Sequence, residues 1–202
     1  MGIDLSLNST AITCKETHDS NFVVYFFTQT KSLASKFDNS FYLPKNLVNL
    51  SRLDFVYSKI KEILIKEEPE YVAIEDYSYG SIGQHFSIGE LGGIIKLLIV
   101  KEFEIPLRLY KPTQIKQFVT GKGNSPKSIM LTAIYKKYKV DFSKYETAAD
   151  DVADSYGIMR MLSTELKLRE EVTKAKGVEK SLFTSELGYC NQNFITLRSN
   201  KL

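Results

Sequence analysis

Four acidic residues stand at positions where carboxylates could hold metal ions. Asp4 lies in the first extended segment, and Glu75 ends a short apolar run. Asp151 and Asp154 are three residues apart in a helical pattern, so they share one helix face. An all-oxygen ligand set favours hard cations such as Mg²⁺ or Mn²⁺ over zinc. Two such ions about 4 Å apart can activate water and stabilise the leaving oxygen in phosphodiester hydrolysis.

Two neighbouring acids are second candidates, for supporting contacts. Asp76 follows Glu75 and would face the opposite side of a strand. Asp150 is rotated by about 100° from Asp151 on a helix. Taken singly, any of these acids could be a solvated helix residue or a turn former, and only their convergence in one fold favours a metal site.

A basic segment extends from Arg108 to Lys144 and contains a single acid, Asp141, although the net charge of the whole chain is only +3. Its basic residues are Arg108, Lys111, Lys116, Lys122, Lys127, Lys136, Lys137, Lys139 and Lys144. A basic segment in an otherwise net acidic chain fits a phosphate backbone, although a solvated charged face explains most such runs.

The first elements expected to position these residues are strands. Extended segments at residues 2–5, 11–14 and 22–27 predict a three-stranded antiparallel meander. Apolar residues three or four apart over residues 47–64 predict an amphipathic helix. Residues 71–75 form a short apolar run without helical period, which predicts a buried parallel strand with Glu75 at its end.

Helices and strands then alternate. We expect a helix over residues 91–99, a strand over 106–110 and a short helix with Pro112 in its first turn. Further helices are expected from Ser125-Pro126 to about residue 138, and over about 148–166.

These elements predict an α/β fold, with a mixed five-stranded sheet flanked by helices. The first and fourth strands of this sheet would lie side by side. Asp4 and Glu75 would then face a common site, against which the last helix packs.

Length and composition are those of one globular unit. With 202 residues, 43% of them hydrophobic, the chain can bury one core, and we assign residues 1–167 to one domain and 168–202 to a C-terminal extension of unknown role. There is neither an apolar run of membrane-spanning length nor a signal-peptide pattern, so we expect no membrane association and a cytoplasmic location. Cys14 and Cys190 do not form a metal-binding pair and are interpreted as ordinary thiols.

At these residues the chain resembles the RuvC family of Holliday-junction resolvases, which have the RNase H-like fold. The resemblance covers roughly residues 1–165 and rests on Gly2-Ile3-Asp4, Ala73-Ile74-Glu75, Asp151 to Asp154 and the segment from Ile115 to Lys127. The most specific stretch is Ile-Lys-Gln-Phe-Val-Thr-Gly-Lys-Gly at residues 115–123, followed by Lys127. The tail and the Lys- and Asn-rich composition suggest a divergent member, such as one from a bacteriophage.

The resemblance implies an endonuclease that cuts four-way and other branched DNA with two Mg²⁺ or Mn²⁺ ions, as a homodimer. It assigns metal-binding catalytic roles to Asp4, Glu75, Asp151 and Asp154. It assigns phosphate contact or charge stabilisation to Lys116 and Lys127.

DNA contacts are expected from further residues. Lys122, Lys136 and Lys137 belong to the basic segment and would attract the DNA backbone. The family often places an aromatic wedge after the strand-end glutamate, and Tyr79, or else Tyr77, occupies that neighbourhood. A loop tyrosine that caps the core is the alternative. The helix over residues 88–100, with Gly89, Gly92 and Gly93, is a candidate dimer interface, although packing on the sheet explains its apolar residues.

Three rival functions remain open at the level of sequence. Residues 2–10 also resemble a first phosphate loop of actin-like or sugar-kinase ATPases, but the second phosphate loop and second domain of those enzymes are absent from the 202 residues. A non-catalytic DNA-binding module would need no carboxylate cluster. A nuclease of the same fold could act on another substrate, as a packaging nuclease or an RNA–DNA hybrid nuclease.

Overall fold

A computed structural model of the protein describes residues 1–15, 21–76, 85–174 and 194–196. At its centre lies a six-stranded sheet in the order β4-β3-β2-β1-β5-β6. Its strands are β1 (Gly2–Asp4), β2 (Ala11–Lys15), β3 (Phe22–Thr28), β4 (Ser40–Tyr42), β5 (Val72–Glu75) and β6 (Leu107–Tyr110). The first three strands pair antiparallel, and β5 lies parallel to both β1 and β6. The predicted meander and the adjacency of the first and fourth predicted strands are both confirmed.

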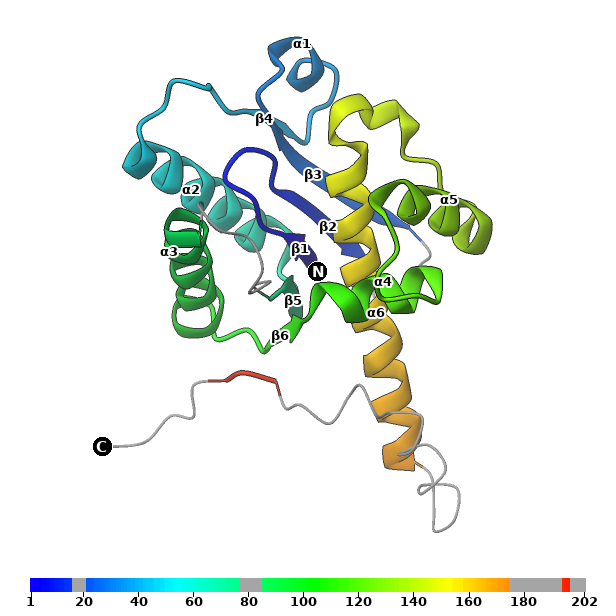
Figure 1. Ribbon diagram of the computed structural model, residues 1–202. Coiled ribbons are helices and arrows are strands. Elements are labelled where there is room, and N and C mark those ends of the chain that lie inside the picture. The colour runs from blue at the N-terminus through cyan, green and yellow to red at the C-terminus, as the bar shows by residue number, and fades with distance from the viewer. Residues whose placement is uncertain (16–20, 77–84, 175–193, 197–202) are drawn as a thin grey trace, which may run out of the picture.

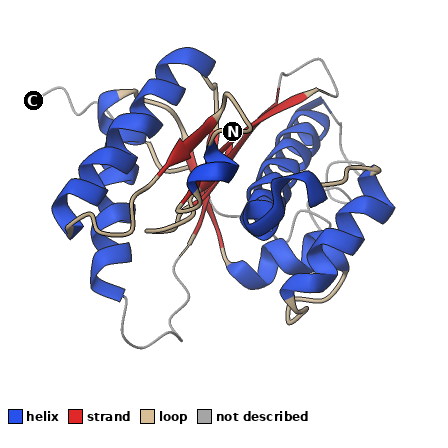
Figure 2. Cartoon of the chain, turned by 90° about the horizontal axis from the view of Figure 1, so that it is seen from above, coloured by secondary structure: helices blue, strands red, loops and turns tan. Residues whose placement is uncertain are grey.

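Helices cover both faces of the sheet (Figures 1 and 2). On one face lie α2 (Asn49–Glu67) and α3 (His85–Leu97), which continues as a π-helical turn, η1 (Leu98–Glu102). The other face is covered by α4 (Pro112–Thr120), α5 (Lys127–Tyr138) and the long α6 (Ala149–Lys174). The short α1 (Lys31–Ala34) precedes β4, and a 3-10 helix, η2 (Ser143–Ala148), leads into α6.

Alternation along the strands directs two sets of side chains to the two faces. Ile3 and Ile74 are fully buried in the core beneath α2 and α3. Ala73 is buried in the other core, which α4, α5 and α6 complete. Asp4 and Glu75 are each one residue further along their strands, so they face the same side as Ala73 and point toward α6.

The sheet has six strands, not the five predicted from the sequence. The additional strand is β4, which pairs in parallel with β3 through Phe26↔Ser40 and Thr28↔Tyr42. It is three residues long, and none of the three is fully buried. Such a short edge strand has no readable alternation of polar and apolar residues, so its pairing depends on the tertiary structure.

The end of the domain also differs in detail from the expected elements. The last helix continues to Lys174, so residue 167 lies inside α6. A three-residue piece of the C-terminal extension, residues 194–196, lies along the edge of the sheet. There Leu107 and Ile195 exchange backbone hydrogen bonds of 3.1 and 2.8 Å.

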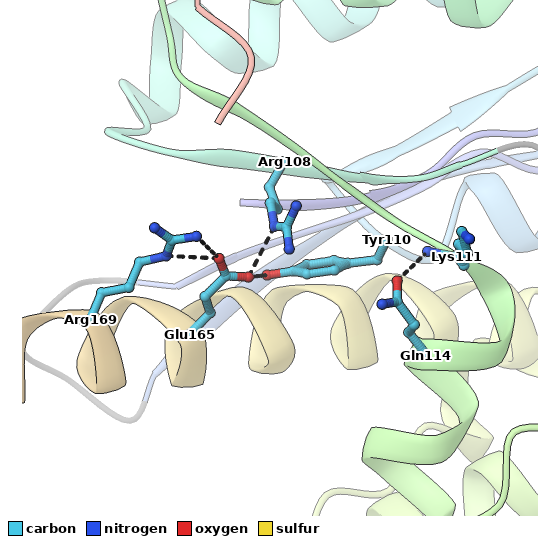
Figure 3. A network of polar contacts seen from close by, with 6 residues as sticks. All are labelled: Arg108, Tyr110, Lys111, Gln114, Glu165 and Arg169. Atoms are coloured by element: carbon cyan, nitrogen blue, oxygen red, sulfur yellow. Dashed lines mark hydrogen bonds and ion pairs between the residues drawn. The ribbon is translucent and has the colours of Figure 1, made fainter. Parts of the chain in front are cut away.

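A buried polar network joins α6 to β6 (Figure 3). Both oxygens of the Glu165 carboxylate are engaged: Arg108 Nε and the Tyr110 hydroxyl donate to Oε2 at 3.0 and 2.7 Å, and Arg169 donates to Oε1. The side chains of Arg108 and Glu165 are each only 2% exposed. Arg108 therefore neutralises a buried carboxylate and is not part of the basic surface that the sequence suggested.

Helix α6 and strand β1 approach each other closely at Gly2. A Cβ atom added there would lie 2.4 Å from the Met159 backbone nitrogen and 2.6 Å from the Ser155 carbonyl oxygen. Next to this contact, the hydroxyls of Thr13 and Ser155 form a buried hydrogen bond of 2.8 Å. Only glycine lets α6 lie this close to β1.

We predict that Gly2→Ala lowers the free energy of unfolding by about 3 kcal/mol or more, because its methyl group would overlap helix backbone that cannot move aside. Gly157→Ala is the matched control, because Gly157 lies in α6, the helix that Gly2 contacts. The nearest neighbour of its Cβ would be the Val119 Cγ2 methyl at 3.1 Å, a side-chain group that can move, so its loss should be much smaller. Denaturant titration measures both changes, and equal losses would contradict the close-packing argument.

Candidate active site

The four predicted acids come from three elements that meet at one end of the sheet. Asp4 ends β1 and Glu75 ends β5, and the register Ile3↔Ile74 makes these two strand ends neighbours. Asp151 and Asp154 lie in the first two turns of α6, which packs on β1 and β5. All four carboxylates are partly buried.

Burial raises the pKa of every one of these carboxyl groups, and neighbouring carboxylates add to the rise. For Asp4 the pKa is well above its ordinary value, because of burial first and then of the charges of Asp154, Glu75 and Asp151. Burial, followed by Asp154, raises the pKa of Glu75 to about 7. Burial also raises the pKa of Asp154 to about 6. The four acids therefore form one electrostatic cluster.

Two lysines from the helices that flank α6 complete this cluster. Lys116 lies on α4, and Lys127 is the first residue of α5. Both charges act to lower the pKa values of Glu75 and Asp154, against the effect of burial. Burial alone would lower the pKa of Lys127, but Asp154, Asp151 and Asp4 raise it overall, so this ammonium stays protonated.

The second candidates are placed differently from the four acids. Asp150 is exposed, although its charge still acts on Asp151 and Asp154. The Asp76 carboxylate lies 3.8 Å from Lys96 of α3, in an ion pair on the other side of the sheet. Asp150 therefore borders the cluster, whereas Asp76 is outside it.

The residues expected to contact DNA fall into three groups. Lys122 and Lys136 are exposed, on the loop after α4 and on α5. Lys137 is exposed as well, but its ammonium donates to the Phe118 carbonyl at 3.2 Å and lies over the Phe118 ring, which ties α5 to α4. Tyr77 and Tyr79 lie outside the described residues.

One polar residue of the site was not expected from the sequence. Ser9, in the turn between β1 and β2, lowers the pKa of Asp151 against the rise caused by burial, and its hydroxyl donates to Ser6 Oγ at 3.3 Å. The sequence identifies Asn8-Ser9-Thr10 only as a turn. Nothing in the spacing indicates that this turn meets a helix that begins 140 residues later.

The donor chemistry of the cluster fits hard divalent cations, since it consists of carboxylates with two lysines beside them. Within residues 1–15, 21–76, 85–174 and 194–196, however, no three acidic, histidine or cysteine side chains converge as ligands around one point. The structure thus brings the acids into mutual electrostatic contact without closing them into a ligand shell.

A mixed sheet with acids at the ends of two adjacent strands, and a helix that adds two more, defines a domain of the RNase H-like fold. The model of the family described as crossover junction endodeoxyribonuclease RuvC matches residues 34–159. The chain belongs to the RuvC family, whose members are metal-dependent endodeoxyribonucleases. Glu75, Lys116, Lys127 and the two acids of α6 lie inside the matched range, and Asp4 precedes it.

Curated relatives show the same similarity. The chain is 36% identical over 108 residues to the RuvC endonuclease of Carboxydothermus hydrogenoformans, an alignment that covers 53% of this chain and 66% of that protein. It is 34% identical over 111 residues to the RuvC endonuclease of Fusobacterium nucleatum, which covers 54% of this chain and 58% of the relative. The chain therefore aligns with somewhat less than two thirds of the length of these two relatives.

Solved structures support the fold. RuvC of Thermus thermophilus superposes with a TM-score of 0.52 at 18% identity, over 80% of this chain and 95% of that one. The same protein in complex with a Holliday junction substrate gives a TM-score of 0.50 at 17% identity, over 80% and 94% of the two chains. In the described part of the chain, no helix has both the length and the apolar character needed to cross a membrane.

We predict that the metal-free protein becomes less stable as the pH rises from about 5.5 to about 8. The pKa of Glu75 is about 7 in the folded protein, above the value of a glutamate in an unfolded chain. The folded state therefore binds more protons in this range, and its stability falls as they leave. Glu75→Gln removes this titration and should flatten the profile of thermal midpoints measured in EDTA.

Added Mg²⁺ or Mn²⁺ should stabilise the wild type more at about pH 8 than at about pH 5.5, because metal binding requires deprotonated carboxylates. Identical pH profiles for the wild type and Glu75→Gln would contradict this account of the cluster.

Proposed function

We propose that the protein is a crossover junction endodeoxyribonuclease, which hydrolyses phosphodiester bonds in four-way and other branched DNA, and that it acts in the cytoplasm. The observation that carries this proposal is the electrostatic cluster of Asp4, Glu75, Asp151 and Asp154 at the meeting point of β1, β5 and α6. Membership of the RuvC family and the branched-DNA complex of the Thermus thermophilus protein support it.

In this proposal the four carboxylates hold two divalent metal ions, Mg²⁺ or Mn²⁺. When bound, such ions supply an activated water and stabilise the leaving oxygen. The carboxylates must lose their protons to act as ligands, and the raised pKa values of Glu75 and Asp154 place that loss near neutral pH. Lys116 and Lys127 lie within the field of the same acids and are positioned to stabilise charge that develops on the phosphate.

Three further lysines and one tyrosine would bind the DNA around this site. Lys122 and Lys136 are exposed and free to meet phosphates through general attraction. Lys137 would contribute charge in addition to its contact with Phe118. We propose Tyr79, or else Tyr77, as the aromatic wedge at the junction centre.

The principal alternative is a nuclease of the same fold that acts on another substrate. One gel separates the two: labelled four-way junction, replication fork, flap, linear duplex and RNA–DNA hybrid, each incubated with Mg²⁺ or Mn²⁺. Preferred cleavage of the four-way junction supports the proposal. Preferred cleavage of the hybrid, or of linear duplex, would overturn the substrate assignment while leaving the nuclease assignment intact.

We predict that Asp4→Asn, Glu75→Gln, Asp151→Asn and Asp154→Asn each lower the cleavage rate by more than about a hundredfold, since even residues that only support metal ligands cost up to that much. Junction binding without metal should be largely retained, because the amides preserve shape and remove negative charge. Asp150→Asn is the matched control, since Asp150 is the exposed neighbour, and it should keep most of the rate. Full activity in any two of the four variants would refute the assignment.

Removal of Lys116 or Lys127 should reduce the cleavage rate more than the affinity for junction DNA. We expect Lys116→Ala and Lys127→Ala to slow single-turnover cleavage by about a hundredfold, as loss of one donor to developing charge does. Lys136→Ala should instead weaken binding and reduce its salt dependence. Lys136 is a cleaner comparison than Lys137, whose ammonium also holds α4. Equal effects on rate and binding in all three variants would show that the lysines form only an electrostatic surface.

We also propose that the protein acts as a homodimer, because paired cuts across a four-way junction call for two sites related by two-fold symmetry. Leu91, Ile95 and Leu98 of the candidate interface are buried in the core, as packing on the sheet requires. The outward surface of α3 is different. Leu97 is 61% exposed there, and a Cβ added at Gly89 or Gly93 would meet nothing within 4 Å.

We predict that Leu97→Asp weakens dimerisation at least about tenfold, as expected when a charge replaces a central apolar contact. Tyr135→Asp is the control, because Tyr135 is similarly exposed, at 56%, but lies on α5 across the sheet. Sedimentation at micromolar concentration measures both, and the incisions on a supercoiled cruciform show whether cuts are paired. A wild type that is strictly monomeric and releases only singly nicked junctions would rule out the dimer.

A further inference from the structure

Helix α6 is bound to the sheet by buried polar contacts at two points, on two different strands. Close to its acids, the Ser155 hydroxyl shares a hydrogen bond of 2.8 Å with Thr13 of β2. Further along, Glu165 accepts hydrogen bonds from two side chains of β6. In the sheet order β2-β1-β5-β6, the two strands that end in acids lie between these anchors. The two polar contacts therefore fix the direction in which α6 crosses β1 and β5.

The second anchor is a buried ion pair. Arg108 Nε and the Tyr110 hydroxyl donate to the same oxygen of Glu165 at 3.0 and 2.7 Å (Figure 3). The side chains of Arg108 and Glu165 are each only 2% exposed. Hydrogen bonds are directional, and a buried charge that loses its partner is costly. At Glu165, α6 can therefore neither slide nor turn without a large loss.

The apolar contacts of α6 restrict its position less. Between the two anchors the helix buries Ile158, Met159, Met161 and Leu162. Methionine side chains are flexible and adapt to many arrangements. At Gly2 the strand has no side chain that could interlock with the helix. These contacts determine how close α6 lies to the sheet, whereas the directional polar contacts determine where along the sheet it lies.

The buried ion pair is connected to the acids through both elements that it joins. Tyr110 is the register partner of Glu75, on a strand about 4.8 Å away, and the Asp76 amide donates to the Tyr110 carbonyl at 2.8 Å. From there the Tyr110 side chain extends along α6 to Glu165 (Figure 3). On the helix, Glu165 lies about three turns after Asp154 and on the same face.

The proposed metal site depends on the placement of α6 more strongly than the core does. A slip of the helix by one residue moves its acids by about 1.5 Å. Metal–ligand distances vary by only about 0.2 Å, and a misplacement of reacting groups by about 1 Å can lower a rate about a hundredfold. Small displacements that a flexible core tolerates would thus disturb the carboxylates.

We infer that Arg108, Tyr110 and Glu165 form a positioning network for the nuclease site, which sets the distance between the acids of α6 and those of β1 and β5. This inference rests on the proposed function. Without the network, α6 would be held at the Ser155 contact alone. Its two ends could then swing about that point, and Asp151 and Asp154 would no longer be fixed relative to the strand acids.

The test replaces the network by apolar side chains of similar size, in the triple variant Arg108→Met/Tyr110→Phe/Glu165→Leu. Such replacements of buried ionic groups often keep or raise stability, so we expect a thermal midpoint in EDTA at least equal to that of the wild type. Mn²⁺ affinity, measured by calorimetry, should nevertheless fall about tenfold, the lower range for residues that support metal ligands. The Mn²⁺ concentration for half-maximal junction cleavage should rise by the same factor.

The matched control makes the same kind of change on the opposite face of the sheet. There the Tyr25 hydroxyl donates to Glu67 of α2, and Tyr25 is buried in the core beneath α2 and α3. Tyr25→Phe/Glu67→Leu should leave both Mn²⁺ quantities unchanged, because α6 is not held by this pair. An equal loss in the control would show that any buried polar pair affects the site, and would overturn the inference.

The single variant Arg108→Met distinguishes positioning from stability. It removes one charge of a buried pair, so it should unfold at a lower temperature than the triple variant. If metal affinity only followed stability, the triple variant would bind Mn²⁺ as well as the wild type does. The inference requires weak Mn²⁺ binding by a stable triple variant, and wild-type affinity in the folded triple variant would overturn it.

Tyr110→Phe provides a second test should the triple variant not fold. It removes one donor to Glu165 and keeps the ring and the ion pair with Arg108. We expect Mn²⁺ affinity to fall about threefold, since one hydrogen bond of the network is lost. Unchanged affinity in this variant would contradict the positioning role.

The outcomes also separate this inference from the proposed function. If the wild type binds Mn²⁺ but cleaves no branched DNA, the proposed function fails, and calorimetry still decides the positioning role. If the wild type binds Mn²⁺ and cleaves, and the folded triple variant keeps its metal dependence, the positioning role fails alone. A wild type that binds no Mn²⁺ would overturn both.

Discussion

The close contact between β1 and α6 at Gly2 is the constraint on which the rest of the structure depends. Because Gly2 has no side chain, the backbone of α6 near Ser155 and Met159 lies against the strand. Asp4 is two residues further along the strand, and Asp154 immediately precedes Ser155 on the helix. The same contact that packs the core thus brings together carboxylates that are 150 residues apart in sequence.

Such a cluster is electrostatically unfavourable for the folded chain. Burial and repulsion raise the pKa of Asp4, Glu75, Asp151 and Asp154 together, and the charges of Lys116 and Lys127 offset only part of this cost. The other half of α6 has the opposite character. There Glu165 is buried with Arg108 and Tyr110 in a fully partnered network, which anchors the helix to β6 while its first turns carry the unpaired charge (Figure 3).

The basic residues from Arg108 to Lys144 differ in how deeply their side chains are buried. Arg108 is buried and structural, whereas Lys116 and Lys127 interact with the acids and Lys136 faces solvent. Lys137 combines a solvent-facing position with a contact to Phe118. Basic residues from one stretch of sequence thus lie in three different environments. Only some of these residues are available to a phosphate backbone.

The sequence by itself determined the alternation of strands and helices, because apolar periodicity follows directly from which side of each element is buried. It also identified the acids at strand ends and in the first turns of the last helix, since those positions follow from element boundaries. The meander, the adjacency of β1 and β5 and the approach of α6 agree with those expectations.

Only the tertiary structure decided the remaining features. β4 is too short to show a period, and the burial of Arg108 depends on Glu165, which lies 57 residues further along the chain. The hydrogen bonds of Arg52 with the β1–β2 turn and with the segment before α2 join segments that share no local pattern. Hydrogen bonds between distant polar side chains depend on the final distances between elements, and the sequence specifies those distances only through the packing of the whole core.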